Sequence, residues 1–146
     1  MKKIVLFLIL TISIQSLYSQ SSNKSKAPEK HKISMVLLDY IEGTSNGEPD
    51  RLKNAFDRDL NLYSVQDNKL SVLSGQKYIS YFKKGEKRNR IGKVVSIDFV
   101  NDVAMAKIEI DVPYRKRLYT DYLMLLKIEG EWKIIHKSYT YVSYSR

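Results

Sequence analysis

Asp121 and His136 are the two residues whose types and placement best suit chemistry. An aspartate beside a histidine can fix the imidazole tautomer and create a proton acceptor, as hydratases and isomerases require. The same pair also forms simple buried hydrogen bonds that satisfy both groups, and this structural interpretation is the commoner one. Tyr40, Tyr63 and Tyr119 could bring hydroxyl groups to the same cavity, although ring packing is their default role.

The two candidates lie on a β-hairpin that spans residues 118–142. Its arms are rich in β-branched and aromatic residues, and Glu129-Gly130 supplies the positive φ of a tight turn. With a two-residue loop, Leu123 faces His136, so Asp121 becomes the diagonal neighbour of that histidine. One face of the hairpin then carries Tyr119, Asp121, Leu123, Leu125, Trp132, Ile134 and His136. We expect a ligand to bind at the polar, open end of this face.

A second hairpin, residues 93–110, precedes the first and turns at Asn101-Asp102. A two-residue loop pairs Phe99 with Ala104, Ile97 with Ala106 and Val95 with Ile108. The small alanines leave room on the inner face for a neighbouring side chain or a ligand.

Three helices are predicted before the second hairpin. Apolar residues at helical spacing define the first over residues 29–42, and Gly43 is placed just beyond its end. Pro49 suits the first turn of a second helix through residues 50–56. Ser74 can cap a third helix over residues 75–84.

The order of elements predicts an α+β fold. Two short strands, residues 61–65 and 69–73, lie between the second and third helices, and the long hairpins follow. Three helices on the concave face of a strongly curved, mainly antiparallel sheet would account for this order.

The N-terminus predicts export. Residues 1–19 have the basic start, the short apolar run and the polar end of a signal peptide, with cleavage near Ser19. Residues 20–28 indicate a flexible, Lys-containing tether, and residues 29–142 form the single folded domain. We therefore expect the protein to be secreted or periplasmic.

The net charge and the composition of the chain limit the classes of binding partner that we expect. The 25 Lys and Arg and 16 Asp and Glu residues give a formal net charge of +9, which loss of Lys2 and Lys3 with the leader lowers by two to +7. Export argues against nucleic acid as a partner and favours weak association with an anionic envelope surface or an acidic ligand. Two histidines do not make a typical metal site, and no phosphate loop or nucleophile motif is present, so we expect no metal and no cofactor.

Several segments carry a resemblance to a known family. They are Tyr40-Ile-Glu-Gly43, Asn54-Ala-Phe56, Leu62-Tyr-Ser-Val65, Val103-Ala-Met-Ala-Lys107 and, above all, the stretch from Tyr119 to Lys137 with Asp121-Tyr-Leu and Gly130-Glu-Trp-Lys-Ile134. From about Lys30 to Tyr141 the chain resembles the Putative lumazine-binding family of the nuclear transport factor 2-like (NTF2-like) superfamily. Asp57-Arg58 stands where relatives often carry His-Pro, so any role of that histidine is absent here.

The resemblance implies a bacterial NTF2-like cone that holds a small, partly aromatic molecule between sheet and helices. The expected ligand contacts are Tyr40, Tyr63, Tyr119, Asp121, Trp132 and His136. Two alternatives remain open: an isomerase or dehydratase that uses the Asp121–His136 pair, and a structural dimerisation module with a filled cone. We also expect a homodimer through the outer strand faces that carry Tyr122, Met124, Ile135, Tyr139 and Tyr141.

Overall fold

The computed structural model describes residues 27–145. Residues 33–145 form one compact unit, and the fold below is that of this unit together with the helical residues 27–32 that lead into it. The expected signal peptide and most of the expected tether lie outside the described residues. Residues 27 and 28, assigned to the tether from the sequence, are already helical.

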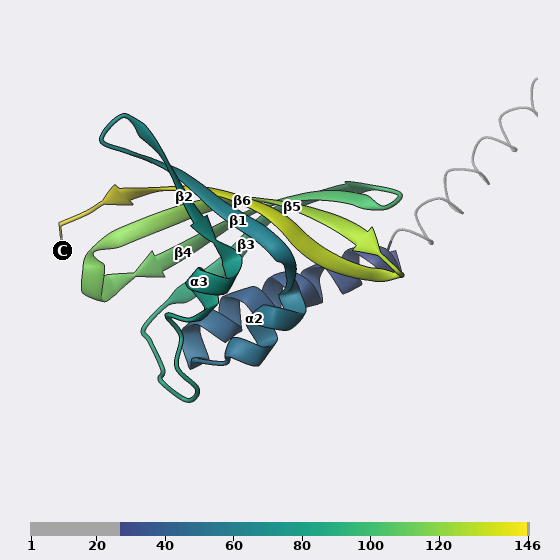
Figure 1. Ribbon diagram of the computed structural model, residues 1–146, viewed down its shortest axis with the longest axis horizontal. Helices are drawn as coiled ribbons and strands as arrows, with labels where there is room; N and C mark the ends of the chain where they lie inside the picture. Colours follow the sequence, from purple (N-terminus) through teal and green to yellow (C-terminus); the bar gives the residue numbers. More distant parts are fainter. Residues whose placement is uncertain (1–26, 146) are drawn as a thin grey trace, which may run out of the picture. The chain divides into compact units, whose positions relative to one another are not determined.

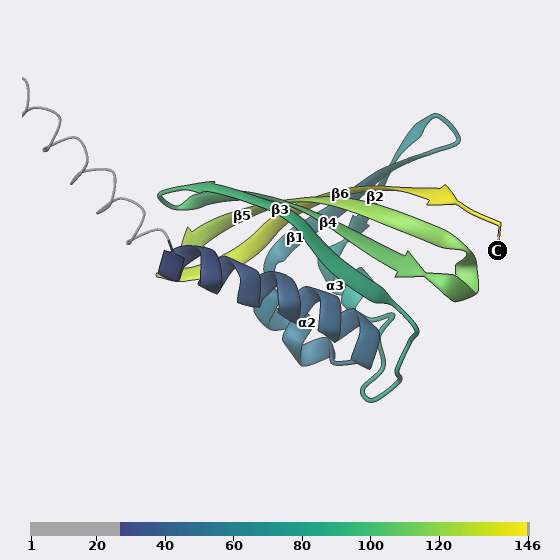
Figure 2. The same cartoon turned by 180° about the vertical axis from the view of Figure 1, so that it is seen from behind.

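A six-stranded sheet forms the main layer, in the order β2-β1-β6-β5-β4-β3. Its strands are β1 (Phe56–Gln66), β2 (Lys69–Ser74), β3 (Ile91–Val100), β4 (Val103–Val112), β5 (Arg117–Ile128) and β6 (Glu131–Ser143). All neighbours pair antiparallel except β1 and β6, which run parallel. Figures 1 and 2 show the sheet bent over the helices, which all lie on its concave side. The α+β architecture with a mainly antiparallel sheet is confirmed.

The helices differ in length from their sequence predictions. The first runs from residue 27 to residue 46 and is followed by α2 (Pro49–Ala55). Gly43 lies inside the first helix, where a Cβ atom would be 2.8 Å from Leu52 Cδ2, so it permits close helix packing. The helix ends at Gly47, whose φ of +65° suits glycine.

Two further differences concern the chain after α2. Phe56, placed in the second helix from the sequence, instead begins β1. The third helix, α3 (Gly75–Ile79), is capped by Ser74 as predicted but is only five residues long. It stops early because the chain turns there and buries Phe82 against the core. A short 3-10 helix, η1 (Pro113–Arg115), links β4 to β5.

Both predicted turns form, but each hairpin contains a bulge. In β3 the register shifts at Val95, so Val94 rather than Val95 faces Ile108. In β6 it shifts at Ile135, so Met124 faces His136 and Leu123 faces Lys137. Because a bulge inserts one extra residue, it reverses which face each later side chain occupies.

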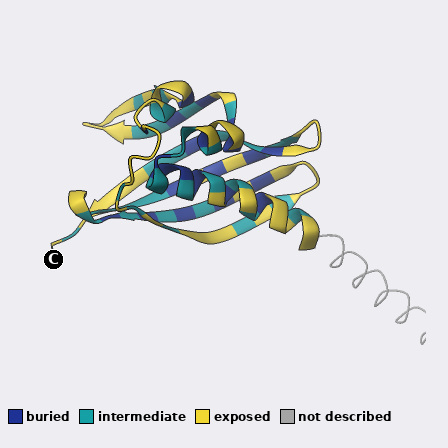
Figure 3. Cartoon of the chain, turned by 90° about the horizontal axis from the view of Figure 1, so that it is seen from below, coloured by how far each residue is buried: buried dark blue, intermediate teal, exposed yellow. Residues whose placement is uncertain are grey.

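The core lies between the concave face and the helices. Ile33, Leu37 and Tyr40 of the first helix pack with alternating residues of β4 and β5, among them Ile108 and Leu123. Figure 3 shows buried segments in dark blue on the strands and on the helices that cross them, while most of the loops are exposed. Burial is continuous toward the β5–β6 turn and weakens at the opposite end, where the site described next is found.

Candidate functional site

A cavity of about 200 Å³ lies on the concave side, beyond the apolar core. Its wall is formed by strands β1, β2, β5 and β6 together with side chains from α3, the segment before β3, and η1. The lining residues are Leu62, Leu73, Tyr78, Tyr81, Arg90, Arg115, Tyr119, Asp121, Lys137 and Tyr139. Aromatic rings and charged groups therefore meet in a space suited to a small metabolite rather than a drug-sized ligand.

Asp121 and Lys137 form an ion pair in the cavity wall. Lys137 Nζ donates to Asp121 Oδ2 over 2.7 Å, and the two residues are only 4% and 0% exposed. Tyr40 OH donates to the same oxygen over 2.8 Å and also accepts a hydrogen bond from Lys137. Asp121 comes from β5, Lys137 from β6 and Tyr40 from the first helix, so this cluster joins sheet and helix at one point.

Three tyrosine rings surround the Lys137 ammonium. Nζ lies 4.8 Å from the ring centre of Tyr40, 5.4 Å from that of Tyr78 and 5.1 Å from that of Tyr139. These are cation–π distances, and the faces of the rings compensate in part for lost hydration. The lysine is therefore held by Asp121 and by the surrounding rings, in the wall of the cavity.

Two of the residues that line the cavity each have a buried polar atom with no hydrogen-bond partner among the described residues. These atoms are Asp121 Oδ1 and Arg90 Nε. A buried polar atom without a partner is costly, and such atoms at a cavity wall are groups that a ligand can satisfy.

Burial and neighbouring charges shift the pKa values of Tyr40 and Arg90. Burial raises the pKa of Tyr40 well above its ordinary value, and the charge of Asp121 raises it further. Burial would lower the pKa of Arg90, but Tyr78, Tyr40 and Asp121 nearby outweigh it, so the pKa is raised and the guanidinium stays charged.

Tyr119 lies at the rim of the cavity under two arginines. Burial opposes ionisation of its hydroxyl, but hydrogen bonds from Arg117 and Arg115 outweigh burial and lower the pKa of Tyr119. The Arg117 Nη1 atom lies 3.4 Å from that hydroxyl. The rim is thus a region of positive potential.

The predicted Asp121–His136 pair does not form. The bulge at Ile135 turns His136 to the convex face, where its ring stacks on Tyr63 at 4.7 Å and Nε2 lies 2.8 Å from Ser138 Oγ. The expected diagonal geometry is wrong because it assumed an unbulged hairpin.

The remaining predicted contacts are divided between several places. Tyr119 and Asp121 line the cavity, and Tyr40 lies directly behind it, bonded to Asp121. Trp132 is buried in the core and does not line the cavity, and Tyr63 lies with His136 on the convex face.

A family profile described as Putative lumazine-binding matches residues 28–140. The chain belongs to the Putative lumazine-binding family. The solved structures most useful for comparison are NTF2-like proteins of unknown function. One from Shewanella baltica OS155 is 27% identical, has a TM-score of 0.71, and is matched over 80% of this chain and 96% of that one.

Two more distant NTF2-like structures support the fold alone. The protein from Silicibacter pomeroyi DSS-3 is 18% identical, with a TM-score of 0.70 and coverage of 80% of this chain and 98% of that one. The protein from Methylobacillus flagellatus KT is 22% identical, with a TM-score of 0.69 and coverage of 80% and 94%. In sequence, the aldolase FrzH of Cladobotryum sp. is 25% identical over 99 residues, which are 67% of this chain and 79% of the relative.

Sequence reasoning missed three central groups of this lumazine-binding-family cavity: Lys137, Arg90 and Tyr78. Lys137 was assigned to the wrong face because nothing in the β6 sequence marks Ile135 as the extra residue. Arg90 lay in a basic run that is usually a solvated surface. The neighbours of Lys137 in the sequence are His136 and Ser138, so nothing local separates it from a surface lysine.

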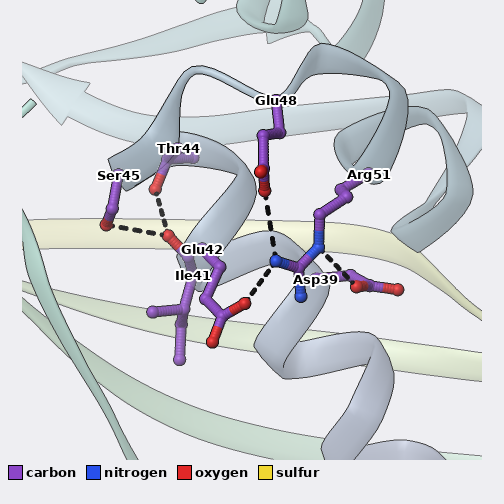
Figure 4. Close-up of polar contacts among 7 residues, drawn as sticks. All are labelled: Asp39, Ile41, Glu42, Thr44, Ser45, Glu48 and Arg51. Atoms are coloured by element: carbon purple, nitrogen blue, oxygen red, sulfur yellow. Dashed lines mark hydrogen bonds and ion pairs between the residues drawn. The ribbon is translucent and has the colours of Figure 1, made fainter. Parts of the chain in front are cut away.

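An acidic cluster around Arg51 fixes the corner between the first helix and α2 (Figure 4). Arg51 Nε donates to Asp39 over 2.8 Å, and Nη1 contacts Glu42 and lies 3.1 Å from Glu48. Partial burial opposes the charge of Arg51, but the three carboxylates outweigh it and raise its pKa. This cluster is a structural clamp and does not line the cavity.

Three larger hollows on the described chain have no fully buried charge in their walls. One of about 570 Å³ lies beside Arg51, one of about 330 Å³ beside Asp57 and Arg58, and one of about 320 Å³ beside Tyr63 on the convex side. Within residues 27–145 no group of three or more His, Cys, Asp or Glu side chains is arranged so that it could hold a metal ion. No helix of that same part is long and apolar enough to span a membrane.

Proposed function

We propose that this protein is an exported small-molecule-binding domain whose ligand occupies the cavity between sheet and helices. The observation that carries the proposal is the cavity itself, which places the buried Asp121–Lys137 pair within walls of tyrosine. A concave pocket with aromatic walls and a few convergent polar groups is the usual form of a ligand site. The cavity also argues against the alternative of a purely structural module with a filled cone.

The chemistry of the wall favours a small aromatic ligand. Tyr78, Tyr119 and Tyr139 offer ring faces and edges, and Leu62 and Leu73 complete an apolar side. Membership of the Putative lumazine-binding family supports the same class of ligand, although nothing in the cavity is specific to a pteridine.

A cavity-filling variant tests this proposal. Leu73 lines the cavity, whereas Val72, its neighbour in β2, is exposed on the other face. We expect thermal-shift screening of an aromatic metabolite set to find ligands that stabilise the wild type and Val72→Trp but not Leu73→Trp. Ligands that stabilise all three proteins equally would place binding elsewhere and contradict the proposal.

The convex face supports a homodimer. Val103, Met105, Tyr122 and Met124 expose apolar surface on adjacent strands β4 and β5. Large exposed apolar patches commonly mark interaction sites. Tyr139 and Tyr141, expected on this face from the sequence, instead contact Tyr119 on the concave side because of the β6 bulge.

Light scattering tests the dimer. We expect a dimeric mass for the wild type and for Ile128→Lys, which changes an exposed residue at the end of the hairpin. The double change Met105→Lys and Met124→Lys should give a folded monomer because it places charge in the centre of the patch. A monomeric wild type at micromolar concentration contradicts the dimer.

The proposal also includes the location of the protein outside the cytoplasm. Export to the periplasm or the medium rests on the leader-like sequence of residues 1–19 and is tested by N-terminal sequencing of exported material. An intact Met1 in a cytoplasmic fraction contradicts it. Weak association with anionic surfaces rests on the basic net charge, and sedimentation with vesicles of phosphatidylglycerol in low salt tests it.

An enzyme is the second candidate, and one observation favours it. Lys137 presents a buried amine to the cavity, and lysines of this kind form imines with carbonyl substrates. The similarity to the aldolase FrzH is consistent with carbonyl chemistry. Imine formation requires the Lys137 ammonium first to give a proton to Asp121, after which Nζ joins the carbonyl carbon and water is released. Borohydride reduces the imine to an amine, so borohydride with pyruvate should leave a stable adduct on Lys137 in a peptide map. A map without that adduct removes this form of the enzyme proposal.

A further inference from the structure

The two buried atoms without a hydrogen-bond partner, Asp121 Oδ1 and Arg90 Nε, need opposite kinds of partner. Asp121 Oδ1 is a carboxylate oxygen and can only accept a hydrogen bond, while Arg90 Nε can only donate one. The other oxygen of Asp121 already accepts from Lys137 and Tyr40. A ligand that satisfies both atoms must therefore carry a donor and an acceptor at different places.

The charges of the wall decide the nature of the acceptor. Four lining side chains are charged: Arg90, Arg115 and Lys137 are positive and Asp121 is negative. Three positive charges and one negative charge give a net charge of +2. Since Asp121 and Lys137 neutralise each other, the uncompensated charges belong to the two arginines. Guanidinium groups bind carboxylates through well-directed, charge-assisted hydrogen bonds.

The distribution of these groups separates the two ends of the site. Asp121 is fully buried and Arg90 is partly exposed, whereas Arg115 on η1 is exposed. A ligand that enters with its donor first can reach Asp121 and leave its anionic group near the arginines. The rings of Tyr78, Tyr119 and Tyr139 lie along the walls between.

We propose that the cavity selects small aromatic carboxylates that carry a ring hydroxyl or ring N–H, with that donor bonded to Asp121 Oδ1 and the carboxylate held by Arg90 and Arg115. This ligand class rests on the proposed binding function and makes it more specific. Neutral aromatics satisfy the walls but not the arginines, and simple aromatic acids satisfy the arginines but leave Asp121 Oδ1 without a partner.

Three matched probes test the proposal by isothermal titration calorimetry at pH 7. They are 4-hydroxybenzoate, which has both groups, benzoate, which lacks the donor, and 4-hydroxybenzamide, which lacks the charge. Loss of one hydrogen bond to a charged group is expected to weaken binding about tenfold or more. We therefore expect 4-hydroxybenzoate to bind at least about tenfold tighter than either of the other two.

A pair of variants locates the carboxylate. Arg115→Gln should reduce the preference for 4-hydroxybenzoate over 4-hydroxybenzamide several-fold. The control is Lys116→Gln, which removes the same charge from the adjacent, exposed residue that does not line the cavity. It should leave the preference intact. Both positions are exposed, so neither change threatens folding.

The outcomes separate this inference from the proposed function. Equal affinity for 4-hydroxybenzoate and benzoate would overturn the role of Asp121 Oδ1, and equal affinity for the amide would overturn that of the arginines. If neutral aromatics bind in a manner blocked by Leu73→Trp while none of the acids binds, the inference fails and the binding function stands. If no aromatic compound binds at millimolar concentration, both fail.

Discussion

Replacing Lys137 by methionine should destabilise the protein severely. The change keeps the length and apolar stem of the side chain but removes the ammonium that lies 2.7 Å from Asp121 Oδ2. The carboxylate is fully buried and would keep only the Tyr40 hydroxyl, at 2.8 Å, as a donor. Breaking a buried ion pair in this way costs about 3–5 kcal/mol.

The expected loss of stability comes from leaving the buried charge of Asp121 without its partner. It does not measure how much the intact ion pair contributes to stability. Replacing both residues by apolar ones of similar size is often neutral or stabilising, because neither charge then has to be desolvated. The double variant Asp121→Leu and Lys137→Met should therefore be more stable than Lys137→Met alone. The coupling between the two changes should exceed about 1 kcal/mol, as is found for residues in direct contact.

Urea unfolding followed by Trp132 fluorescence and by circular dichroism measures these differences. Lys107→Met is a suitable control because Lys107 lies on the convex face of β4, paired with Tyr122, away from the cavity. We expect it to change the free energy of unfolding by less than about 1 kcal/mol. If Lys137→Met also stays within about 1 kcal/mol of wild type, or if the double variant loses the sum of both single losses, the reasoning is refuted.

Four shorter predictions follow. The pKa of Tyr40 in the folded protein lies above its ordinary value of 10.0. The stabilising effect of the neutral hydroxyl is therefore complete below pH 10 and is lost as the pH rises through the folded pKa. We expect the difference in unfolding free energy between wild type and Tyr40→Phe to shrink above pH 10 when urea unfolding is measured as a function of pH. Gly92→Ala should cost about 1–3 kcal/mol in the same assay, since its Cβ would lie 2.3 Å from Ile41 Cγ2. Arg51→Gln should cost about 1 kcal/mol, and less at 1 M salt, because its ion pairs are partly exposed. His136→Asn should leave calorimetric affinity for any cavity ligand within about threefold, since the imidazole lies on the convex face, where truncating it removes no contact with the ligand.

Each of these has a result that would contradict it. A constant difference between wild type and Tyr40→Phe from pH 7 to 11 would mean that the hydroxyl is not buried in the folded state. An unchanged free energy of unfolding for Gly92→Ala would show that β3 and the first helix can separate at no cost. Salt-independent loss in Arg51→Gln would point to packing instead of charge. A large affinity loss in His136→Asn would place the ligand on the convex face.

The fold was predictable because its signals are local and repeated. The turns at Asn101 and Glu129-Gly130 lie where the residue types place them, both with positive φ. The alternation of apolar residues assigns Ile97, Phe99, Ala104 and Ala106 to one face, and the observed register agrees. Helix ends were less predictable, because Gly43 can either end a helix or allow two helices to approach closely.

The candidate site was predictable only in part, and the reason is a single residue. Asp121 precedes the bulge in the pairing and was placed correctly, while His136 follows Ile135 and was placed on the wrong face. Residues 134 and 135 are both isoleucine, so the sequence contains no feature that tells which position a bulge should occupy. The partner of Asp121 therefore had to come from the structure.

The position of the Asp121–Lys137 pair within the sheet argues for binding rather than for stability. Toward the turn, the same two strands fill the concave face with Leu125 and Ile134, which are fully buried without any desolvation cost. Residues of that kind could also fill the space at the other end, at no loss of stability. The sheet instead carries a buried charge pair there, leaves one carboxylate oxygen without a partner, and opens a cavity beside it. Departures from the most stable choice that gather at one place are expected where a surface recognises a ligand.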